Sequence, residues 1–425
     1  MNSPGPATIP TTPTIAIVGA GAAGLMAAIS AGRAVRDRGG KNRIVLLDGA
    51  NKIGVKILVA GGGRCNVTHH AVDEKQYAGT SRNTIRKVLR AFGVQDTVAF
   101  FEELGVTLKR EGTGKLFPTT DKAQTVLGAL LGEVERLGVE LVHPWRVREV
   151  ERVDGGFVLS RANSTETMRT DRLVLCSGGM ALPRSGSDGG GYTIARALGH
   201  TITERVFPAL VPLVVGPESA WLTELSGVSC RAGVEVRSST GKRLARFEND
   251  LLCTHFGLSG PGPMDASRYL TAARHEDRSA TLFICWIDEP FETIDAALQG
   301  LGQRTPLAFV REHLPERLAC ALCVRAGVDP ACLGNQLPRE PRRQLAHLLA
   351  GTPIEVSGDR GFTHAEVTAG GVPLGEINPA TMASRASENV WLAGEILDVD
   401  GRIGGFNFQW AWASGHVAGR SAAGE

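Results

Sequence analysis

The hydrophobic pattern is clearest in residues 14–32, where an apolar run leads through a glycine-rich turn into a helix of small residues. Ile15 to Val18 is apolar and largely β-branched, which is typical of a buried strand. The turn occupies Gly19 to Gly24, and alanine-rich sequence follows it. A second apolar run covers 43–47. The pattern predicts a strand–helix–strand unit at the start of the folded chain.

Segments with apolar residues at helical spacing then alternate along the chain with segments that have the apolar–polar alternation of strands. Apolar residues at helical spacing predict helices within 82–104 and 121–137, the latter with Asp121 as its N-cap. Alternation over 139–176 predicts a meander of strands that ends in an apolar run. Short strands between 206 and 287 predict a separate antiparallel unit.

The pattern returns to strand and glycine loop near the carboxyl end, and these elements together predict an α/β protein. We expect a discontinuous Rossmann-like domain with an inserted antiparallel β-barrel-like domain and a small helical domain. The predicted parts are a disordered leader (1–13), the nucleotide-binding domain (14–205 and 365–425), the barrel-like domain (206–288 and 351–364) and the helical domain (289–350).

Composition narrows the functional classes. The 425 residues are 43% hydrophobic and 21% charged, and the formal net charge is +2. This balance gives no electrostatic reason to expect nucleic acid or a membrane as partner. No Lys or Arg precedes the apolar stretch 15–29, which argues against a signal peptide. We therefore expect a cytoplasmic protein.

The eight cysteines are scattered and lie mostly in apolar runs, which favours reduced thiols. Cys320 and Cys323, with Cys332 beyond, have the spacing of a partial metal site. No matching second pair follows them in the sequence, so no metal is expected.

The first glycine-rich turn has the spacing of a dinucleotide-binding fingerprint. It consists of Gly19, Ala20, Gly21, Ala22, Ala23 and Gly24. The first glycine allows the tight turn, the second admits a diphosphate, and the third lets helix and strand pack closely. Asp48 ends the second strand, where a ribose hydroxyl needs an acceptor. The alternative is a buried turn with fortuitous glycines, but the flanking strand and helix favour a nucleotide.

A second glycine-rich segment follows at 61–66, Gly61-Gly62-Gly63-Arg64-Cys65-Asn66. Three consecutive residues without Cβ let a planar ligand lie against the backbone. A flexible loop is the alternative interpretation.

The third signal lies near the carboxyl end. A strand ends at Gly394-Glu395, Asp398 follows, and Gly404-Gly405 open an apolar helix. A carboxylate there can hold a sugar-like hydroxyl, and the helix N-terminus can face an electron-rich ring. A solvated acidic loop is the alternative. Two nucleotide-type sites at opposite ends of one chain favour a single extended ligand, FAD.

With these motifs in place, the chain resembles the bile-acid Δ4,6-reductase-like family of NAD(P)/FAD-dependent oxidoreductases over nearly its whole length. The motifs that carry the resemblance are VGAGAAGL (18–25), GGGRCNVT (61–68), GKLFP (114–118), CSGG (176–179), THFGLSGP (254–261), EVTAGGV (366–372) and the segment 393–419. Departures are Val55 before Lys56, Cys176-Ser177, and the acidic residue within 187–191.

The resemblance implies that FAD contacts residues from several of these segments, with Val147 meeting the adenine. The residues expected around the cofactor are the glycine-rich turn 19–24, Asp48, Lys56, Gly62, Gly63, Arg64, Cys65, Asn66, Val147, Gly178, Gly394, Glu395, Asp398, Gly404, Gly405, Phe406 and Asn407.

The expected activity is flavin-dependent reduction of an electron-poor, enone-like C=C bond in a small molecule. His255 is the candidate acid, because histidine titrates near neutral pH. The alternative is a histidine that only hydrogen-bonds its loop. Cys65 has no second thiol nearby, since the next cysteine is Cys176, so dithiol chemistry is not favoured.

A single G-x-G-x-x-G indicates no second Rossmann domain for NAD(P)H. This donor then binds transiently, or electrons come from elsewhere. Two other classes stay open: an RNA-modifying flavoprotein, for which Arg339, Arg342 and Arg343 form a small basic cluster, and a flavin-binding sensor without turnover. The substrate, the choice between NADH and NADPH and the oligomeric state stay open too.

Overall fold

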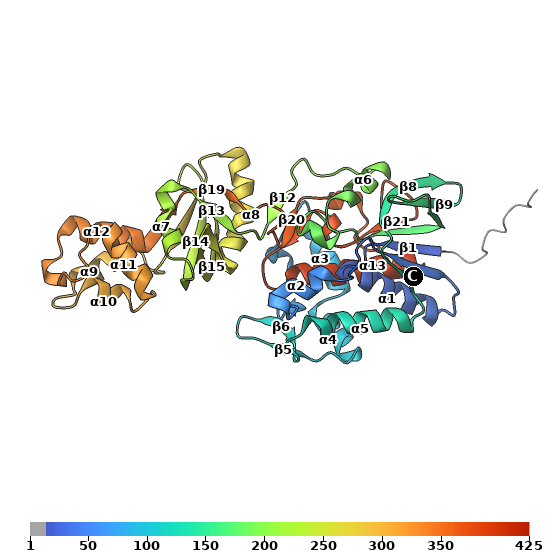
Figure 1. The fold of residues 1–425 in the computed structure, drawn as a ribbon, viewed down its shortest axis with the longest axis horizontal. Coiled ribbons are helices and arrows are strands. Elements are labelled where there is room, and N and C mark those ends of the chain that lie inside the picture. Colours follow the sequence, from blue (N-terminus) through green and yellow to red (C-terminus); the bar gives the residue numbers. More distant parts are fainter. Residues whose placement is uncertain (1–13, 425) are drawn as a thin grey trace, which may run out of the picture. The chain divides into compact units, whose positions relative to one another are not determined.

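The structure is a computed structural model that describes residues 14–424. The expected disordered leader at 1–13 lies outside the described residues. The chain divides into two compact units, whose elements are labelled in Figure 1. Unit 1 combines the chain up to Phe207 with the chain from Val367 onward, and unit 2 is the continuous segment Pro208–Glu366.

Unit 1 is built on a parallel five-stranded sheet with the order β21-β11-β1-β2-β7. These strands are β1 (Thr14–Val18), β2 (Arg43–Leu47), β7 (Glu140–Val142), β11 (Arg172–Leu175) and β21 (Val390–Leu392). From β1 the chain proceeds to β2 on one side, and β11 joins on the other side. This reversal makes a topological switch point at the carboxyl ends of β1 and β11. The predicted α/β class and strand–helix–strand unit are confirmed.

Two helices of unit 1 pack so closely that only small residues fit between them. They are α1 (Ala22–Asp37) and α13 (Phe406–Ala422). A Cβ on Gly415 would lie 2.4 Å from the Ala23 carbonyl oxygen, and one on Gly419 would lie 2.2 Å from that of Ala27. α13 begins at Phe406, directly after the glycine pair, because Gly405 takes a left-handed φ of 93° and caps it.

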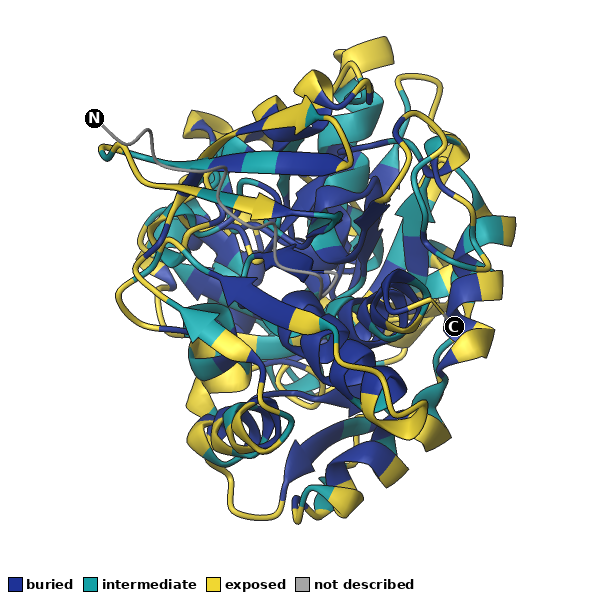
Figure 2. Cartoon of the chain, turned by 90° about the vertical axis from the view of Figure 1, so that its right-hand side faces the viewer, coloured by how far each residue is buried: buried dark blue, intermediate teal, exposed yellow. Residues whose placement is uncertain are grey.

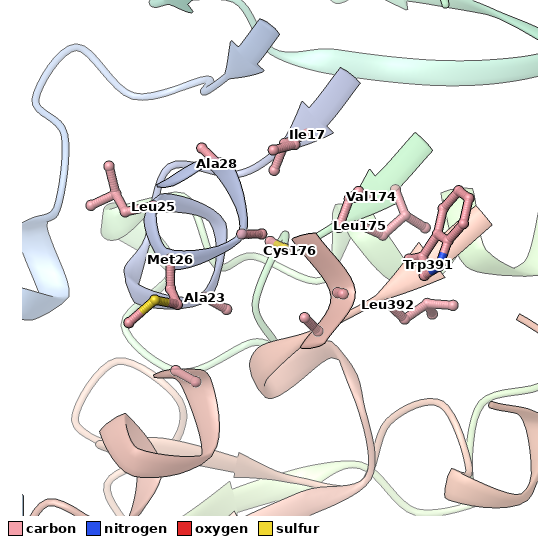
Figure 3. Close-up of a cluster of buried hydrophobic side chains, with 14 of the residues drawn as sticks. Ile17, Ala23, Leu25, Met26, Ala28, Val174, Leu175, Cys176, Trp391 and Leu392 are labelled. Atoms are coloured by element: carbon pink, nitrogen blue, oxygen red, sulfur yellow. The ribbon is translucent and has the colours of Figure 1, made fainter. Parts of the chain in front are cut away.

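The core of unit 1 lies between this helix pair and the sheet. Figure 2 shows buried residues along the central strands and helix, with exposed residues on the peripheral elements. Figure 3 shows Cys176 among apolar side chains of α1, β11 and β21. All five residues of β1 are buried. This burial explains why the strands read as continuous apolar runs rather than as alternating ones.

The remaining elements of unit 1 surround the sheet. The helices are α2 (Val55–Gly63), α3 (Arg82–Ala91), α4 (Val94–Glu103), α5 (Ala123–Arg136) and α6 (Gly190–Ala197). The strands are β3 (Thr68–His69), β4 (Tyr77–Gly79), β5 (Leu108–Arg110), β6 (Lys115–Pro118), β8 (Val147–Val153), β9 (Gly156–Arg161), β10 (Thr167–Thr170), β20 (Val367–Ala369) and β22 (Val399–Gly401). The meander β8-β9-β10 delivers β11 to the sheet, as predicted.

One predicted cap is wrong. The N-cap of α5 is Lys122, and no side chain of the described residues caps it by a hydrogen bond. Asp121 has a positive φ of 53° and pairs with Lys109 instead. The nearby ammonium competes with the helix end for the carboxylate.

Unit 2 contains a seven-stranded antiparallel sheet with the order β18-β17-β14-β15-β16-β13-β19. The strands are β13 (Leu213–Val215), β14 (Ser229–Arg237), β15 (Arg243–Thr254), β16 (Gly257–Ser259), β17 (Thr281–Cys285), β18 (Thr352–Ile354) and β19 (Val356–Asp359). The two edge strands, β18 and β19, are separated by one residue, Glu355. The edges of the sheet must therefore approach each other at this corner, which makes the sheet barrel-like.

Helices complete unit 2. They are α7 (Trp221–Glu224), α8 (Pro261–Glu276), α9 (Phe291–Gln299), α10 (Pro306–Val310), α11 (Glu316–Arg325) and α12 (Arg339–Gly351). Leu318 of α11 and Leu345 of α12 join the same hydrophobic core as Ile284 of β17. The helical segment and the sheet thus share one core, and the boundaries given above for four separate parts stay a prediction.

Within residues 14–424, no helix combines the length and the hydrophobicity that crossing a membrane requires.

Candidate functional site

The glycine-rich turn after β1 is shaped by two close approaches and one open space. Gly19 has φ 103°, and a Cβ there would lie 2.3 Å from the Cys176 carbonyl oxygen. A Cβ on Gly24 would lie 1.7 Å from the Gly19 carbonyl oxygen. By contrast, a Cβ on Gly21 would meet no heavy atom of the described residues within 4 Å. The first and third glycines are therefore required by packing, and the second faces free space.

Gly21 is also the N-cap of α1, and no side chain of the described residues caps this helix end by a hydrogen bond. The amides of a first helical turn have no partner within the helix. Together with the positive end of the helix dipole, they form an anion site of the kind that binds phosphate.

Asp48 supports this turn directly. Its Oδ2 accepts a hydrogen bond from the Ala20 amide at 2.7 Å, and its Oδ1 accepts one from the Ala50 amide at 2.7 Å. Each carboxylate oxygen has a second lone pair. Binding of a ribose hydroxyl by Asp48 stays a prediction.

The glycine triplet adopts three consecutive left-handed conformations, with φ values of 59°, 69° and 87° at Gly61, Gly62 and Gly63. All three residues are exposed. A Cβ on Gly62 would meet no described heavy atom within 4 Å. The segment belongs to the end of α2, whose helical geometry breaks at Ala60. This backbone presents an open surface, as the planar-ligand interpretation requires.

The three residues after the triplet are more enclosed. Cys65 is fully buried, and burial raises the pKa of its thiol to about 12. Arg64 pairs with Glu111 at 2.5 Å, and its guanidinium lies 4.0 Å from the centre of the Phe117 ring. Asn66 is 8% exposed, and its Oδ1 finds no hydrogen-bond partner among the described residues.

Lys56 and Glu395 meet although 338 residues separate them in the sequence. The distance from Lys56 Nζ to Glu395 Oε2 is 2.8 Å. Glu395 Oε1 accepts a hydrogen bond from the Thr368 amide at 3.0 Å. The ion pair therefore joins the start of α2 to the carboxyl-terminal segment and to β20.

The carboxyl-terminal loop is closed by Asn407. Its side chain accepts from the Gly401 amide at 2.8 Å and donates to the Gly401 carbonyl at 2.9 Å. Gly405 caps α13, and a Cβ there would lie 2.7 Å from the Thr68 carbonyl. Gly404 also has a positive φ, 131°. The segment that follows the glycine triplet thus touches the start of α13.

Aromatic and acidic residues complete this end of unit 1. Phe406 stacks on His69 with ring centres 5.0 Å apart, and its carbonyl accepts from the Tyr77 hydroxyl at 2.7 Å. Asp398 is 6% exposed. Gly394 has φ 79°, and a Cβ there would lie 2.7 Å from that of Ala23. The loop after β21 therefore lies directly on the first turn of α1.

Gly178 and Val147 lie on the remaining strands. Gly178 follows β11 with φ 74°, and a Cβ there would lie 2.4 Å from Ser187 Oγ. Val147 begins β8 and is 8% exposed. All of the predicted cofactor residues belong to unit 1, and seven of them, residues 19–24 and Gly178, follow the two strands that end at the switch point.

His255 belongs to unit 2. It is exposed, in the turn between β15 and β16, and its ring contacts Phe256 with centres 5.0 Å apart. Among residues 14–424, no group of three or more His, Cys, Asp or Glu residues is placed to hold a metal ion.

The sequence interpretation did not identify three side chains in this region. Thr368 Oγ1 accepts from the amides of Met180 and Ala181, at 2.7 and 2.9 Å. The hydroxyls of Ser177 and Tyr192 find no hydrogen-bond partner within 14–424. Only contacts between distant segments identify these residues, and no spacing rule does.

Comparison with known proteins identifies the family of the chain. The model of the family described as HI0933-like protein Rossmann domain matches residues 13–421. The chain is 34% identical to the 3-dehydro-bile acid delta(4,6)-reductase of Clostridium scindens. The alignment spans 415 residues and covers 96% of this chain and 98% of that protein.

Two further relatives carry a different name. The ribosomal RNA dihydrouridine synthase of Escherichia coli is 32% identical, over 94% of this chain and 95% of that protein. The enzyme of the same name from Haemophilus influenzae is 30% identical, over 95% of this chain and 97% of that protein. The family resemblance drawn from the motifs is thereby confirmed. The chain belongs to the HI0933-like family, as a flavoprotein oxidoreductase with a Rossmann FAD-binding fold.

Proposed function

We propose that this protein is an FAD-dependent reductase of C=C bonds conjugated to a carbonyl group, with NAD(P)H as its electron donor. The observation that carries the proposal is that two helices of unit 1, α1 and α13, begin at a glycine N-cap without a side-chain hydrogen bond from the described residues. Gly394 links them, since it follows β21 and approaches Ala23 at the start of α1. A long ligand with a diphosphate at one end and an electron-rich ring at the other fits both.

The residues at the site fit FAD. Gly21 leaves space for a diphosphate, and the exposed triplet 61–63 leaves space for a ring. The unpartnered Oδ1 of Asn66, next to the triplet, is a buried acceptor that a ligand N–H would satisfy. In this proposal the turn 19–24 holds the diphosphate, Asp48 the ribose, and Glu395 and Asp398 the polyol chain.

When bound and reduced, FAD supplies the hydride that an electron-poor C=C bond accepts. The protein then has to place the substrate over the exposed triplet and deliver a proton to the neighbouring carbon. His255 stays the proposed acid, because an imidazole exchanges protons near neutral pH.

The relatives support the reaction class more than the substrate. A bile-acid delta(4,6)-reductase and a dihydrouridine synthase both, by their names, saturate a C=C bond. In uracil that bond is conjugated to the C4 carbonyl, so both substrates are enone-like. We propose a small molecule as the substrate, since unit 2 has 16 Lys and Arg against 19 Asp and Glu residues and lacks a basic excess.

The test starts from the purified protein with FAD, mixed anaerobically with NADH or NADPH while the flavin absorption is followed. We expect rapid bleaching with at least one donor. Reoxidation should then be fast with a 4-en-3-one steroid or another enone and slow with its saturated ketone. Absence of bleaching with both donors would support the sensor alternative. Bleaching without any enone-dependent reoxidation would contradict the proposed substrate class.

RNA reduction is the second candidate, because two relatives are named for ribosomal RNA. The predicted basic cluster lends it little support. Arg342 is paired with Asp295 at 2.8 Å, and Arg343 lies over the Phe291 ring at 5.1 Å. Reoxidation by a uridine-containing RNA, with binding that weakens steeply in salt, would favour this candidate over the small molecule.

A further inference from the structure

Two buried hydroxyl groups of unit 1 lie unpartnered on segments that contact each other. Neither Ser177 Oγ nor Tyr192 Oη finds a hydrogen-bond partner within the described residues. Tyr192 is 4% exposed, and Ser177 is half-buried. A buried polar group without a partner lowers stability, so folded proteins retain few of them. Such a group points to a ligand that satisfies it.

Gly191 connects the segments that carry the two side chains. A Cβ on Gly191 would lie 1.8 Å from Ser177 Oγ, so the serine hydroxyl lies against the residue that precedes Tyr192. The same Cβ would lie 3.5 Å from Cδ1 of Ile396, the residue after Glu395. The loop after β11, the start of α6 and the segment after β21 therefore meet here.

Two carboxylates act on the tyrosine in this region. Burial is the main cause that raises the pKa of Tyr192, and the negative charges of Glu395 and Asp398 raise it further. The phenol therefore stays protonated at neutral pH and can donate a hydrogen bond. Neither carboxylate is its hydrogen-bond partner, which leaves the phenol hydroxyl available to a further group.

The chemistry of these groups selects the ligand. Glu395 is already paired with Lys56, but a phosphate or carboxylate would add negative charge beside the buried Asp398 and would be repelled. An apolar group would leave both hydroxyls unsatisfied. An alcohol hydroxyl accepts from the tyrosine and donates to a carboxylate at the same time. A chain of several hydroxyls satisfies the whole region.

We propose that Ser177 and Tyr192 bind the polyol chain of the flavin cofactor, as partners of Glu395 and Asp398. The inference rests on the proposed function, since it needs FAD in unit 1. The glycine at position 191 is required because a side chain there would displace Ser177 Oγ.

The test compares Tyr192→Phe and Ser177→Ala with the parent protein after removal of the cofactor. FAD is titrated by the quenching of its fluorescence, and ADP by calorimetry as a probe of the other half of the site. For Tyr192→Phe we expect an FAD Kd raised about tenfold, in line with one lost hydrogen bond. The ADP Kd should not change. The Tm of the cofactor-free protein should stay constant or rise, because an unsatisfied hydroxyl has been removed.

Tyr269→Phe in unit 2 is the matched control and should alter neither Kd. If the parent protein does not bind FAD, the proposed function fails. If it binds FAD and both variants keep the parent Kd, only water satisfies the hydroxyls and this inference alone is overturned. A fall in Tm together with weaker ADP binding would assign the hydroxyls a structural role and overturn it as well.

Discussion

The two glycine-rich turns of unit 1 use the same residue type for different physical reasons. In the turn after β1, Gly19 and Gly24 are fixed by neighbouring backbone atoms, at 2.3 and 1.7 Å from where a Cβ would lie. In the triplet 61–63, the conformation is left-handed and the space around Gly62 is empty. At Gly19 and Gly24 contact forbids a side chain, whereas at Gly62 and Gly63 only backbone strain disfavours one.

This difference matters for function because contact and strain have different consequences. A turn fixed by contact is rigid and presents amides in one geometry, which suits a diphosphate. A turn that only strain restricts stays open on one side, which suits a ring that has to meet a substrate. Substitutions by alanine separate the two cases.

The largest effect is expected for Gly24→Ala. Its Cβ would overlap the Gly19 carbonyl oxygen, which is backbone and cannot move without breaking the turn. Overpacking of this kind costs roughly 3 kcal/mol or more, so we expect insoluble protein or a Tm lowered by about 10 °C. Differential scanning fluorimetry measures it. Gly128→Ala is the control: position 128 lies exposed in α5 with no described atom within 4 Å, and this variant should be stabilised by about 0.5–1 kcal/mol.

Gly21→Ala should separate binding from folding. Its φ of −81° suits alanine, and no described atom lies near its Cβ position. The cofactor-free protein should keep its Tm, whereas the FAD Kd should rise at least about tenfold because the methyl group occupies the diphosphate space. Fluorescence titration with FAD gives the Kd. An unchanged Kd would show that the diphosphate does not use this turn.

A smaller effect is expected for Gly62→Ala. At φ 69° an alanine costs about 1–2 kcal/mol but meets no steric clash. The Tm should fall by about 2–8 °C. Gly62→Asn should fall less, since asparagine tolerates the left-handed region. An equal fall in Tm for Gly62→Ala and Gly24→Ala would contradict the distinction between restriction by strain and restriction by contact.

The smallest effect concerns Cys65, which follows the triplet. Burial raises the pKa of this thiol to about 12, and the reactive thiolate forms only as the pH approaches that value. Between pH 7 and 9 we expect little alkylation of Cys65 by iodoacetamide, while the half-buried Cys332 is modified. Peptide mass spectrometry after short exposure measures both. Rapid modification of Cys65 at pH 7 would contradict this expectation and make Cys65 a candidate for thiol chemistry again.

The sequence predicted the parts of unit 1 that depend on local pattern. The run 15–18, the glycine spacing and the strand at 390–392 were recognisable because each follows from short-range geometry. Asp121 does not cap α5, because Lys109 of β5 binds its carboxylate. Propensity describes the isolated segment, and a long-range ion pair overrode it.

The site was predictable only in outline for the same reason. Motifs indicated Lys56 and Glu395 separately, but the 2.8 Å ion pair between them required the fold. Ser177 and Tyr192 stand next to glycine runs in the sequence, and nothing in that pattern reveals that Gly191 brings them together. Burial and missing partners are properties of the assembled unit.

The close contact between α1 and α13 has a consequence for the order in which the protein is made. Unit 2 is one continuous segment, Pro208–Glu366, and is synthesised in full before β21 and α13 are. Until then the sheet of unit 1 lacks its edge strand, and the small residues of α1 lack their cover. Since domains fold as units during synthesis, the inserted unit completes its fold first. The cofactor site can therefore form only after the last thirty described residues have packed against the first thirty.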